Sequence, residues 1–326
     1  MIYLLVIFFL ICLWNVRFTK NDCLTKESTS IINGIFVGLV FFSHFSSYIN
    51  YSNPLYNLFF KGLGQLMVAP FLFFSGYGIY ESIKNKKDYL KNFPKKRFLK
   101  LFINFSLAII FFLIYSFIIG KKYSLMTILL SFIGWTSIGN SNWYIFAMLC
   151  LYAFTYLSFK IFKNKKLALG ILLTLSIIYM IIIHGVGKSS AWYNTILCYP
   201  FGMIFSEYKD IILKSDKHKI IALIILFLLF GISLLIRHNY FIYALRSCIF
   251  VIVMILVLQY IKIGNPILKF LGKYTFEIYI LQRLAFMICQ NFHLNNVLYF
   301  ICSILVTSVI CIIYKFLQNK INYIYK

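Results

Sequence analysis

The chain has 326 residues, of which 62% are hydrophobic and 12% are charged, and its mean hydropathy is +0.86. A soluble domain is about 45–50% apolar and about 25% charged, so this composition excludes a soluble protein and predicts a polytopic membrane protein. The formal net charge of +24 does not indicate nucleic-acid binding, because the basic residues occur in short clusters between apolar segments.

Apolar windows long enough to cross a bilayer recur along the whole chain. We therefore expect an all-α bundle of about eleven transmembrane helices. They lie near residues 1–16, 31–50, 58–81, 99–119, 143–162, 167–186, 191–208, 220–236, 240–261, 273–292 and 297–317. The segment 124–139 is apolar but short, and we expect a re-entrant or interfacial piece there.

The positions of Lys and Arg predict the orientation in the membrane. Of the 32 basic residues, 25 fall in one alternating set of loops, which the positive-inside rule places in the cytoplasm. We expect the protein in a bacterial plasma membrane, with the amino terminus outside and the carboxyl terminus in the cytoplasm. Residues 1–30 are expected to form an additional helix and a basic loop, and residues 31–320 the main membrane domain.

His44 lies within the apolar run 35–45. An ionisable side chain inside hydrocarbon is costly and commonly marks a functional site, and imidazole exchanges a proton near neutral pH. At about 13 residues from the cytoplasmic start of its helix, or roughly 20 Å, it lies slightly beyond the midplane. Two interpretations remain open, a histidine hydrogen-bonded to a neighbouring helix and a general base or acyl-handling residue in a cavity.

The loop 84–100 contains eight basic residues and one acidic residue. Topology and anionic lipid account for most of this charge. The cluster at the start of the next helix is also suited to hold the phosphates of a cytosolic cofactor, with Arg97 as a bidentate fork and lysines as point charges. The lysines of this cluster are Lys95, Lys96 and Lys100.

Other polar residues in apolar segments give weaker signals. Ser75 and Tyr77 offer hydroxyls in the run 73–78, although small residues in membrane helices are more often packing devices. Trp143 is explained equally well as an interfacial anchor. Charged side chains inside the membrane are costly and so rarely accidental; these are Arg246, Glu277 and Arg283.

For Glu277, a structural pair with Lys273 on the same helix is the alternative to a functional role. The eight cysteines are scattered without a Cys-x-x-Cys motif, and no His-Glu-x-x-His or nucleotide-binding glycine pattern occurs. We therefore expect neither a metal site nor a disulfide framework.

Four degenerate motifs occur in a fixed order along the chain. They are residues 32–35 leading to His44, residues 74–77 followed by 97–100, residues 142–144 opening a span that continues to Tyr152, and residues 271–279. In this order and spacing they resemble the bacterial membrane acyltransferase family 3, which transfers acyl groups, commonly acetyl, to extracytoplasmic sugars. The resemblance covers residues 31–317.

The resemblance implies an enzyme that transfers acetyl from cytosolic acetyl-CoA to a hydroxyl of an extracytoplasmic or undecaprenyl-linked glycan, without a metal. It implies His44 as the base or acyl carrier. Donor binding is expected at Lys96, Arg97, Lys100, Asn33 and Ser75. Relay or oxyanion roles are expected for Tyr77, Glu277 and Arg283, and acceptor binding for Trp143, Arg246 and Arg283. The oligomeric state stays open.

The chain departs from the family pattern at three positions. Asn33 stands where the family has an arginine, Lys100 replaces the second arginine of an Arg-x-x-Arg pair, and Gln282 stands where a histidine often ends the last motif. The helix 1–16 would be an addition to a ten-span core.

Two other functions stay open. A transporter or flippase for lipid-linked oligosaccharide would use the same intramembrane charges and should show repeats with broken helices. A polysaccharide polymerase should carry a long outer loop, whereas the expected outer loops are short.

Overall fold

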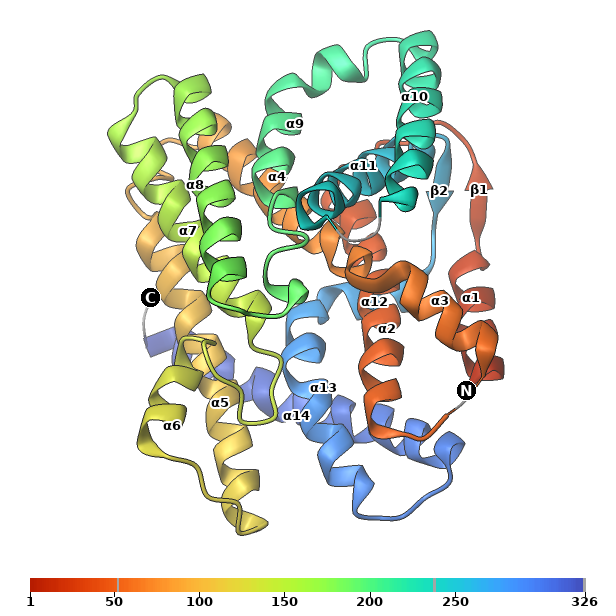
Figure 1. The fold of residues 1–326 in the computed structure, drawn as a ribbon, viewed down its shortest axis with the longest axis vertical. Helices are drawn as coiled ribbons and strands as arrows, with labels where there is room; N and C mark the ends of the chain where they lie inside the picture. Colours follow the sequence, from red (N-terminus) through yellow and green to blue (C-terminus); the bar gives the residue numbers. More distant parts are fainter. Residues whose placement is uncertain (52, 237–238, 325–326) are drawn as a thin grey trace.

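The computed structural model describes residues 1–51, 53–236 and 239–324 as an almost entirely helical protein (Figure 1). The first half contains α1 (Ile2–Leu13), α2 (Lys26–Phe45), α3 (Pro54–Leu63), α4 (Ala69–Asn85), α5 (Lys100–Ile118), α6 (Leu125–Phe132) and α7 (Trp143–Ile161). The second half contains α8 (Lys165–Gly185), α9 (Cys198–Ile212), α10 (Asp216–Leu235), α11 (Tyr240–Leu258), α12 (Pro266–Lys273), α13 (Thr275–Gln290) and α14 (Asn296–Ile324).

Short elements connect or extend these helices. Two strands form one antiparallel pair, β1 (Val16–Phe18) and β2 (Ile261–Ile263). Three short 3-10 helices are η1 (Ser46–Tyr48), η2 (Gly64–Val68) and η4 (Ser190–Trp192), and η3 (Pro94–Leu99) is a short π-helix.

Eight helical segments of the described chain are long and apolar enough to cross a membrane. They are α2, the continuous α3–α4, η3 with α5, α7, α8, α10, α11 and α14. The protein is therefore a polytopic helical membrane protein.

Three of the eleven expected spans are shorter than a full crossing. Helices α1, α9 and α13 have 12, 15 and 16 residues, which is about 18–24 Å against a hydrocarbon core of about 30 Å. A buried non-helical stretch, residues 193–197, precedes α9, and α12 with a break at Tyr274 precedes α13. Irregular backbone is tolerated at such depth only where protein surrounds it, and the apolar windows in the sequence do not reveal these breaks.

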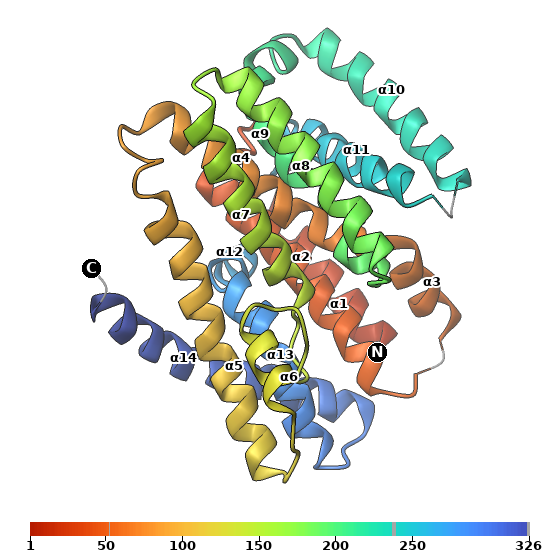
Figure 2. The same cartoon turned by 60° about the vertical axis from the view of Figure 1, so that its left-hand side comes forward.

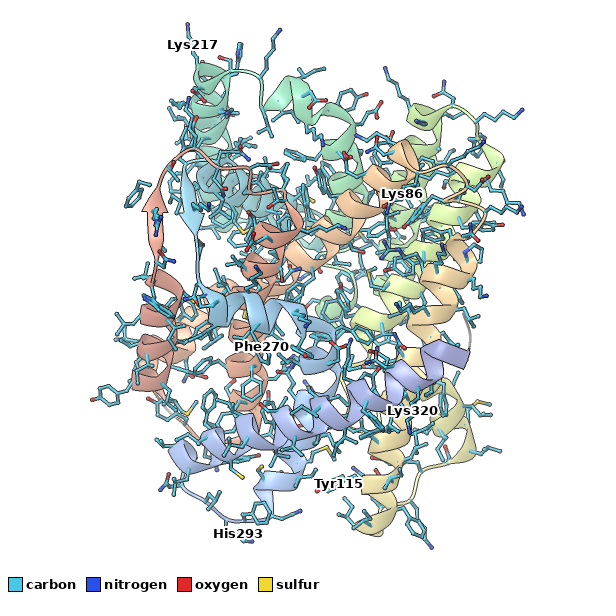
Figure 3. The ribbon with its side chains drawn as sticks, turned by 180° about the vertical axis from the view of Figure 1, so that it is seen from behind. Lys86, Tyr115, Lys217, Phe270, His293 and Lys320 are labelled. Carbon is cyan, nitrogen blue, oxygen red and sulfur yellow. The ribbon has the colours of Figure 1, made fainter. Side chains whose placement is uncertain are left out.

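Three of the basic loops lie together in the structure. Strand β1 pairs with β2, and Lys20 Nζ lies 2.5 Å from Asp216 Oδ2, so three of the basic loops contact one another. Figure 3 shows Lys86 and Lys217 at one end, the basic end, and Tyr115 and His293 at the opposite end. Most long helices run in one common direction between these ends (Figure 2).

Glycines allow two pairs of helices to pack with their backbones in contact. A Cβ at Gly76 of α4 would overlap the carbonyl oxygen of Tyr199, and a Cβ at Gly202 of α9 would overlap that of Phe73. Gly34 meets α12 in the same way. Gly76, the first of the two glycines in the run 73–78, is thus a packing device, which is one of the two interpretations of that motif.

The short apolar segment 124–139 does not form a span. It contains the eight-residue helix α6 and a return toward α7, which is held by a hydrogen bond of 3.0 Å from the Tyr123 hydroxyl to the carbonyl of Ile138. The segment is thus a short piece between α5 and α7, and its re-entrant or interfacial position stays a prediction.

Candidate active site

A cavity of about 880 Å³ opens at the basic end between η3, α5 and α7. The basic side chains in its wall are Lys86, Lys95, Lys96, Arg97 and Lys100, and none of its lining residues is acidic. Single π-helical turns such as η3 occur frequently at functional sites. The three residues expected to bind donor phosphates, Lys96, Arg97 and Lys100, therefore line one cavity.

Arg97 is half-buried at this cavity. Its Nε donates a hydrogen bond of 2.8 Å to the Tyr89 hydroxyl, and the guanidinium lies 5.9 Å from the Tyr89 ring centroid. Within the described chain Arg97 forms no ion pair. Tyr152 lines the inner part of the cavity, with Ser75 beside it. The positive charge of Arg97 is therefore available to an anionic ligand.

His44 lies in the last turn of α2 and contacts α13. Its Nδ1 is 2.9 Å from Nε2 of the fully buried Gln282, and its ring centroid is 6.1 Å from that of Tyr279. Arg283 lies close to both His44 and Tyr48. His44 is therefore hydrogen-bonded to a neighbouring helix, as the first of its two interpretations predicts. This contact alone does not distinguish a structural histidine from a general base.

Several polar atoms around His44 have no partner among the described residues. They are Oε1 of Gln282, the hydroxyl of Tyr279 and Nε of Arg283, and all are buried. The same holds for Oδ1 of Asn33, which lies on the His44 face of α2 about three turns, or 16 Å, toward the basic end. Buried polar groups are nearly always hydrogen-bonded. Of the thirteen unpaired buried side-chain atoms among the described residues, three belong to α13 residues next to His44, which makes its surroundings the candidate site.

His44 lies between two openings on opposite ends of the molecule. Along α13, Phe276 lines the basic cavity, Gln282 follows about 9 Å later, and Cys289 lines a second pocket about 10 Å beyond. This outer pocket has a volume of about 260 Å³, and both Tyr48 and His293 line it. Since His293 marks the opposite end (Figure 3), Gln282, the partner of His44, lies along α13 between the basic cavity and the outer pocket.

A family model described as an acyltransferase domain, that of acyltransferase family 3, matches residues 31–316. The chain belongs to the acyltransferase 3 family. Membership implies acyltransferase activity and an acyl donor. No curated protein and no solved structure matches the chain. Within the part of the chain that the structure describes, no group of three or more His, Cys, Asp or Glu side chains could hold a metal ion.

In this acyltransferase, two expected site residues are engaged away from His44. The hydroxyl of Tyr77 accepts a hydrogen bond of 3.2 Å from Lys209 on α9. Arg246 donates from Nε to Ser233 Oγ at 3.0 Å and from Nη2 to the carbonyls of Ser233 and Ile236, so it satisfies the carboxyl end of α10. These contacts explain both residues structurally.

Glu277 also faces away from His44. Its carboxylate is 2.5 Å from Lys315 Nζ on α14, and its side chain is almost fully buried. The expected partner on the same helix, Lys273, was the wrong lysine, because α13 turns Glu277 toward α14. A helix position five residues before Gln282 lies about 140° away around the axis, so Glu277 and Gln282 serve different neighbours.

The remaining expected residues lie near the site without direct contact to His44. Trp143 begins α7 and packs edge-on against Tyr144, whose ring centroid is 5.2 Å from that of Tyr279. Tyr144, Tyr279 and Tyr152 all fall within the family motifs, but spacing alone did not single them out. Tyr152 lines the basic cavity, while the ring of Tyr279 contacts both Tyr144 and His44.

Proposed function

We propose that this acyltransferase transfers an acetyl group from cytosolic acetyl-CoA to a hydroxyl of an extracytoplasmic or lipid-linked glycan. The observation that carries the proposal is the position of His44 between a basic cavity on one side and a polar pocket on the other. Donor and acceptor approaching from opposite sides would meet at this residue.

The basic cavity supports coenzyme A as the carrier of the acyl group. Coenzyme A has a pyrophosphate and a ribose phosphate, and five basic side chains line the cavity with no acidic residue among them. Arg97 supplies a planar fork, while Lys96 and Lys100 supply point charges. The narrow pantetheine arm would extend past Tyr152 and place the thioester near His44.

The reaction proposed at His44 is a direct acyl transfer. The acceptor hydroxyl gives its proton to His44 Nε2 while its oxygen attacks the thioester carbonyl. The new C–O bond forms, the C–S bond breaks, and the thiolate of coenzyme A takes the proton from the imidazolium. Arg283, with its Nε unpaired, lies where it could stabilise the oxyanion.

The amide of Gln282 sets which nitrogen of His44 is free. With Nε2 of Gln282 facing Nδ1, the imidazole proton must sit on its own Nε2. Turning the amide by 180° presents Oε1, which accepts a hydrogen bond from Nδ1–H of His44 and leaves His44 Nε2 as an acceptor. The proposed base requires this second orientation, so Gln282 acts as a positioning residue.

The outer pocket suits a sugar acceptor. Its wall includes the side chains of Asn50, Gln290, His293 and Asn296, which offer donors and acceptors, together with the ring of Tyr48. Tyr48 follows His44 by one turn, so a hydroxyl bound in this pocket is directed toward the imidazole. Trp143 remains a further candidate for this site, on the α7 side.

The test is the acyl content of the cell-surface glycan in a deletion strain. Complementation with the wild-type gene should restore the ester, and His44→Ala should leave it at least about a hundredfold lower. His184→Ala is the matched control, since the contacts of this ring are with Tyr240 and Tyr193 at the end of α8, away from His44. Full acylation by His44→Ala would refute the role of His44, and loss of the entire polymer on deletion would favour a flippase or polymerase.

A further inference from the structure

A second groove lies on the membrane-facing side of the bundle, behind α2. It has a volume of about 350 Å³ and is bounded by α1, α2, α12–α13 and α14. Figure 3 views this face, with α1 to one side, α14 crossing diagonally and Phe270 labelled between them. Its wall is made by residues such as Phe8, Phe41, Phe270 and Ile304.

The groove offers almost nothing to a polar ligand. The hydroxyls of its two α14 residues are already bonded within the helix, Thr307 to the Ser303 carbonyl at 2.6 Å and Ser308 to the Ile304 carbonyl at 2.8 Å. An apolar hollow of this kind stays dry. In a bilayer, a hydrocarbon chain is therefore the species that fills it.

One end of the groove meets a basic pocket. The two share Phe270, and the basic pocket is lined by Lys26, Lys269 and Lys273. Glu27, also in this pocket, pairs with Lys269 at 2.5 Å, so the pocket keeps an excess of two positive charges. It lies at the start of α2, on the side of the basic loops, where a phosphate at the membrane surface would sit.

We infer that this combined site binds one anionic phospholipid, with an acyl chain in the groove and the phosphate on the three lysines. The apolar groove suits an acyl chain, and the basic pocket at its end suits the phosphate to which that chain is attached. Neither His44 nor its neighbours Tyr279, Gln282 and Arg283 line the groove, so the inference does not depend on the acyl-transfer proposal.

The headgroup is tested by native mass spectrometry of the detergent-solubilised protein with added phosphatidylglycerol or phosphatidylcholine of identical chains. The wild type should retain phosphatidylglycerol preferentially. Replacing Lys26, Lys269 and Lys273 by Gln should weaken retention by about fivefold for each lysine. The matched control replaces Lys163, Lys165 and Lys166 by Gln, which are exposed lysines of another basic loop, and should leave retention unchanged.

Binding of the lipid acyl chain is tested by substitutions that fill the groove. Ser308→Phe places a ring in the groove and should abolish retention, whereas Val309→Phe on the same helix adds a ring outside it and should not. Thermal unfolding of each variant in detergent verifies that it is folded.

Three outcomes would overturn the inference. These are equal retention of the two lipids, equal losses in the two lysine triple variants, and displacement of the lipid by equimolar inorganic phosphate. Equal retention would show that the headgroup charge plays no role. Equal losses in the two triple variants would show only general attraction of the lipid to a basic surface. Displacement by phosphate would show that the acyl chain plays no role.

Discussion

At the scale of single residues, the proposed reactive role of His44 rests on the polar atoms around it. A merely structural histidine would leave its neighbours satisfied, yet Gln282, Tyr279 and Arg283 each keep a buried polar atom without a partner among the described residues. Such atoms cost free energy unless a ligand or water meets them. These unpaired atoms are the reason for our proposal that the site receives a polar group in addition to joining α2 to α13.

We expect Gln282→Ala to reduce the acyl content of the glycan by about a hundredfold, because His44 would lose the partner that fixes its tautomer and orientation. Gln282→His, which again places a hydrogen-bonding side chain beside Nδ1, should restore a large part of the activity. The measurement is ester content normalised to protein level. If Gln282→Ala keeps wild-type acylation, the amide does not position His44.

At the scale of elements, close helix crossings and helix breaks place the site. The glycine contacts between α4 and α9 fix the wall that carries Ser75 and Tyr77. The break at Tyr274 lets α12 pack across the start of α2, while α13 turns Tyr279 and Gln282 toward His44. The short helices α9 and α13 are thus part of the architecture of the site.

The crossing of α4 and α9 predicts opposite effects for two neighbouring glycines. In Gly76→Ala the new Cβ overlaps a backbone carbonyl, so the helices must separate and Tm should fall by about 5 °C. Gly78→Ala meets nothing within 4 Å and gains helix propensity, so its Tm should be unchanged or higher. Thermal unfolding in detergent compares the two, and equal Tm values would contradict the packing role of Gly76.

At the scale of the whole molecule, the excess of Lys and Arg bears both on the membrane orientation and on one cavity. Most basic residues orient the protein in the membrane, but those around the 880 Å³ cavity also enclose a space of single sign. The polar outer pocket lies at the other end, so the molecule offers different chemistry to its two sides.

We expect the double variant Lys96→Gln/Lys100→Gln to weaken coenzyme A binding by about tenfold for each lysine, because each loses a charge-assisted contact with phosphate. The control Lys87→Gln/Lys91→Gln alters exposed lysines of the same loop that do not line the cavity and should change Kd by less than about twofold. Calorimetry in detergent measures both. Added salt should weaken binding by the wild type more than by the Lys96/Lys100 variant, and equal salt dependence would argue against phosphate at this cavity.

The sequence by itself determined the class of protein and the family, because these depend on composition, on the spacing of apolar segments and on motif order. It also pointed to His44 and to the cluster at Arg97, since a polar group in a lipid-compatible chain is conspicuous without coordinates. Eight of the eleven expected spans follow from length and hydropathy alone.

Only the tertiary structure decided which polar residues meet. Arg246, Glu277 and Tyr77 share with His44 the property of being polar in apolar helices, yet each faces another neighbour. Which neighbour each residue faces depends on how its helix is rotated and on which helix packs against it. Neither can be deduced from the local sequence. The same reason explains Gln282: its contact with His44 joins residues 238 positions apart, and the fold alone brings them together.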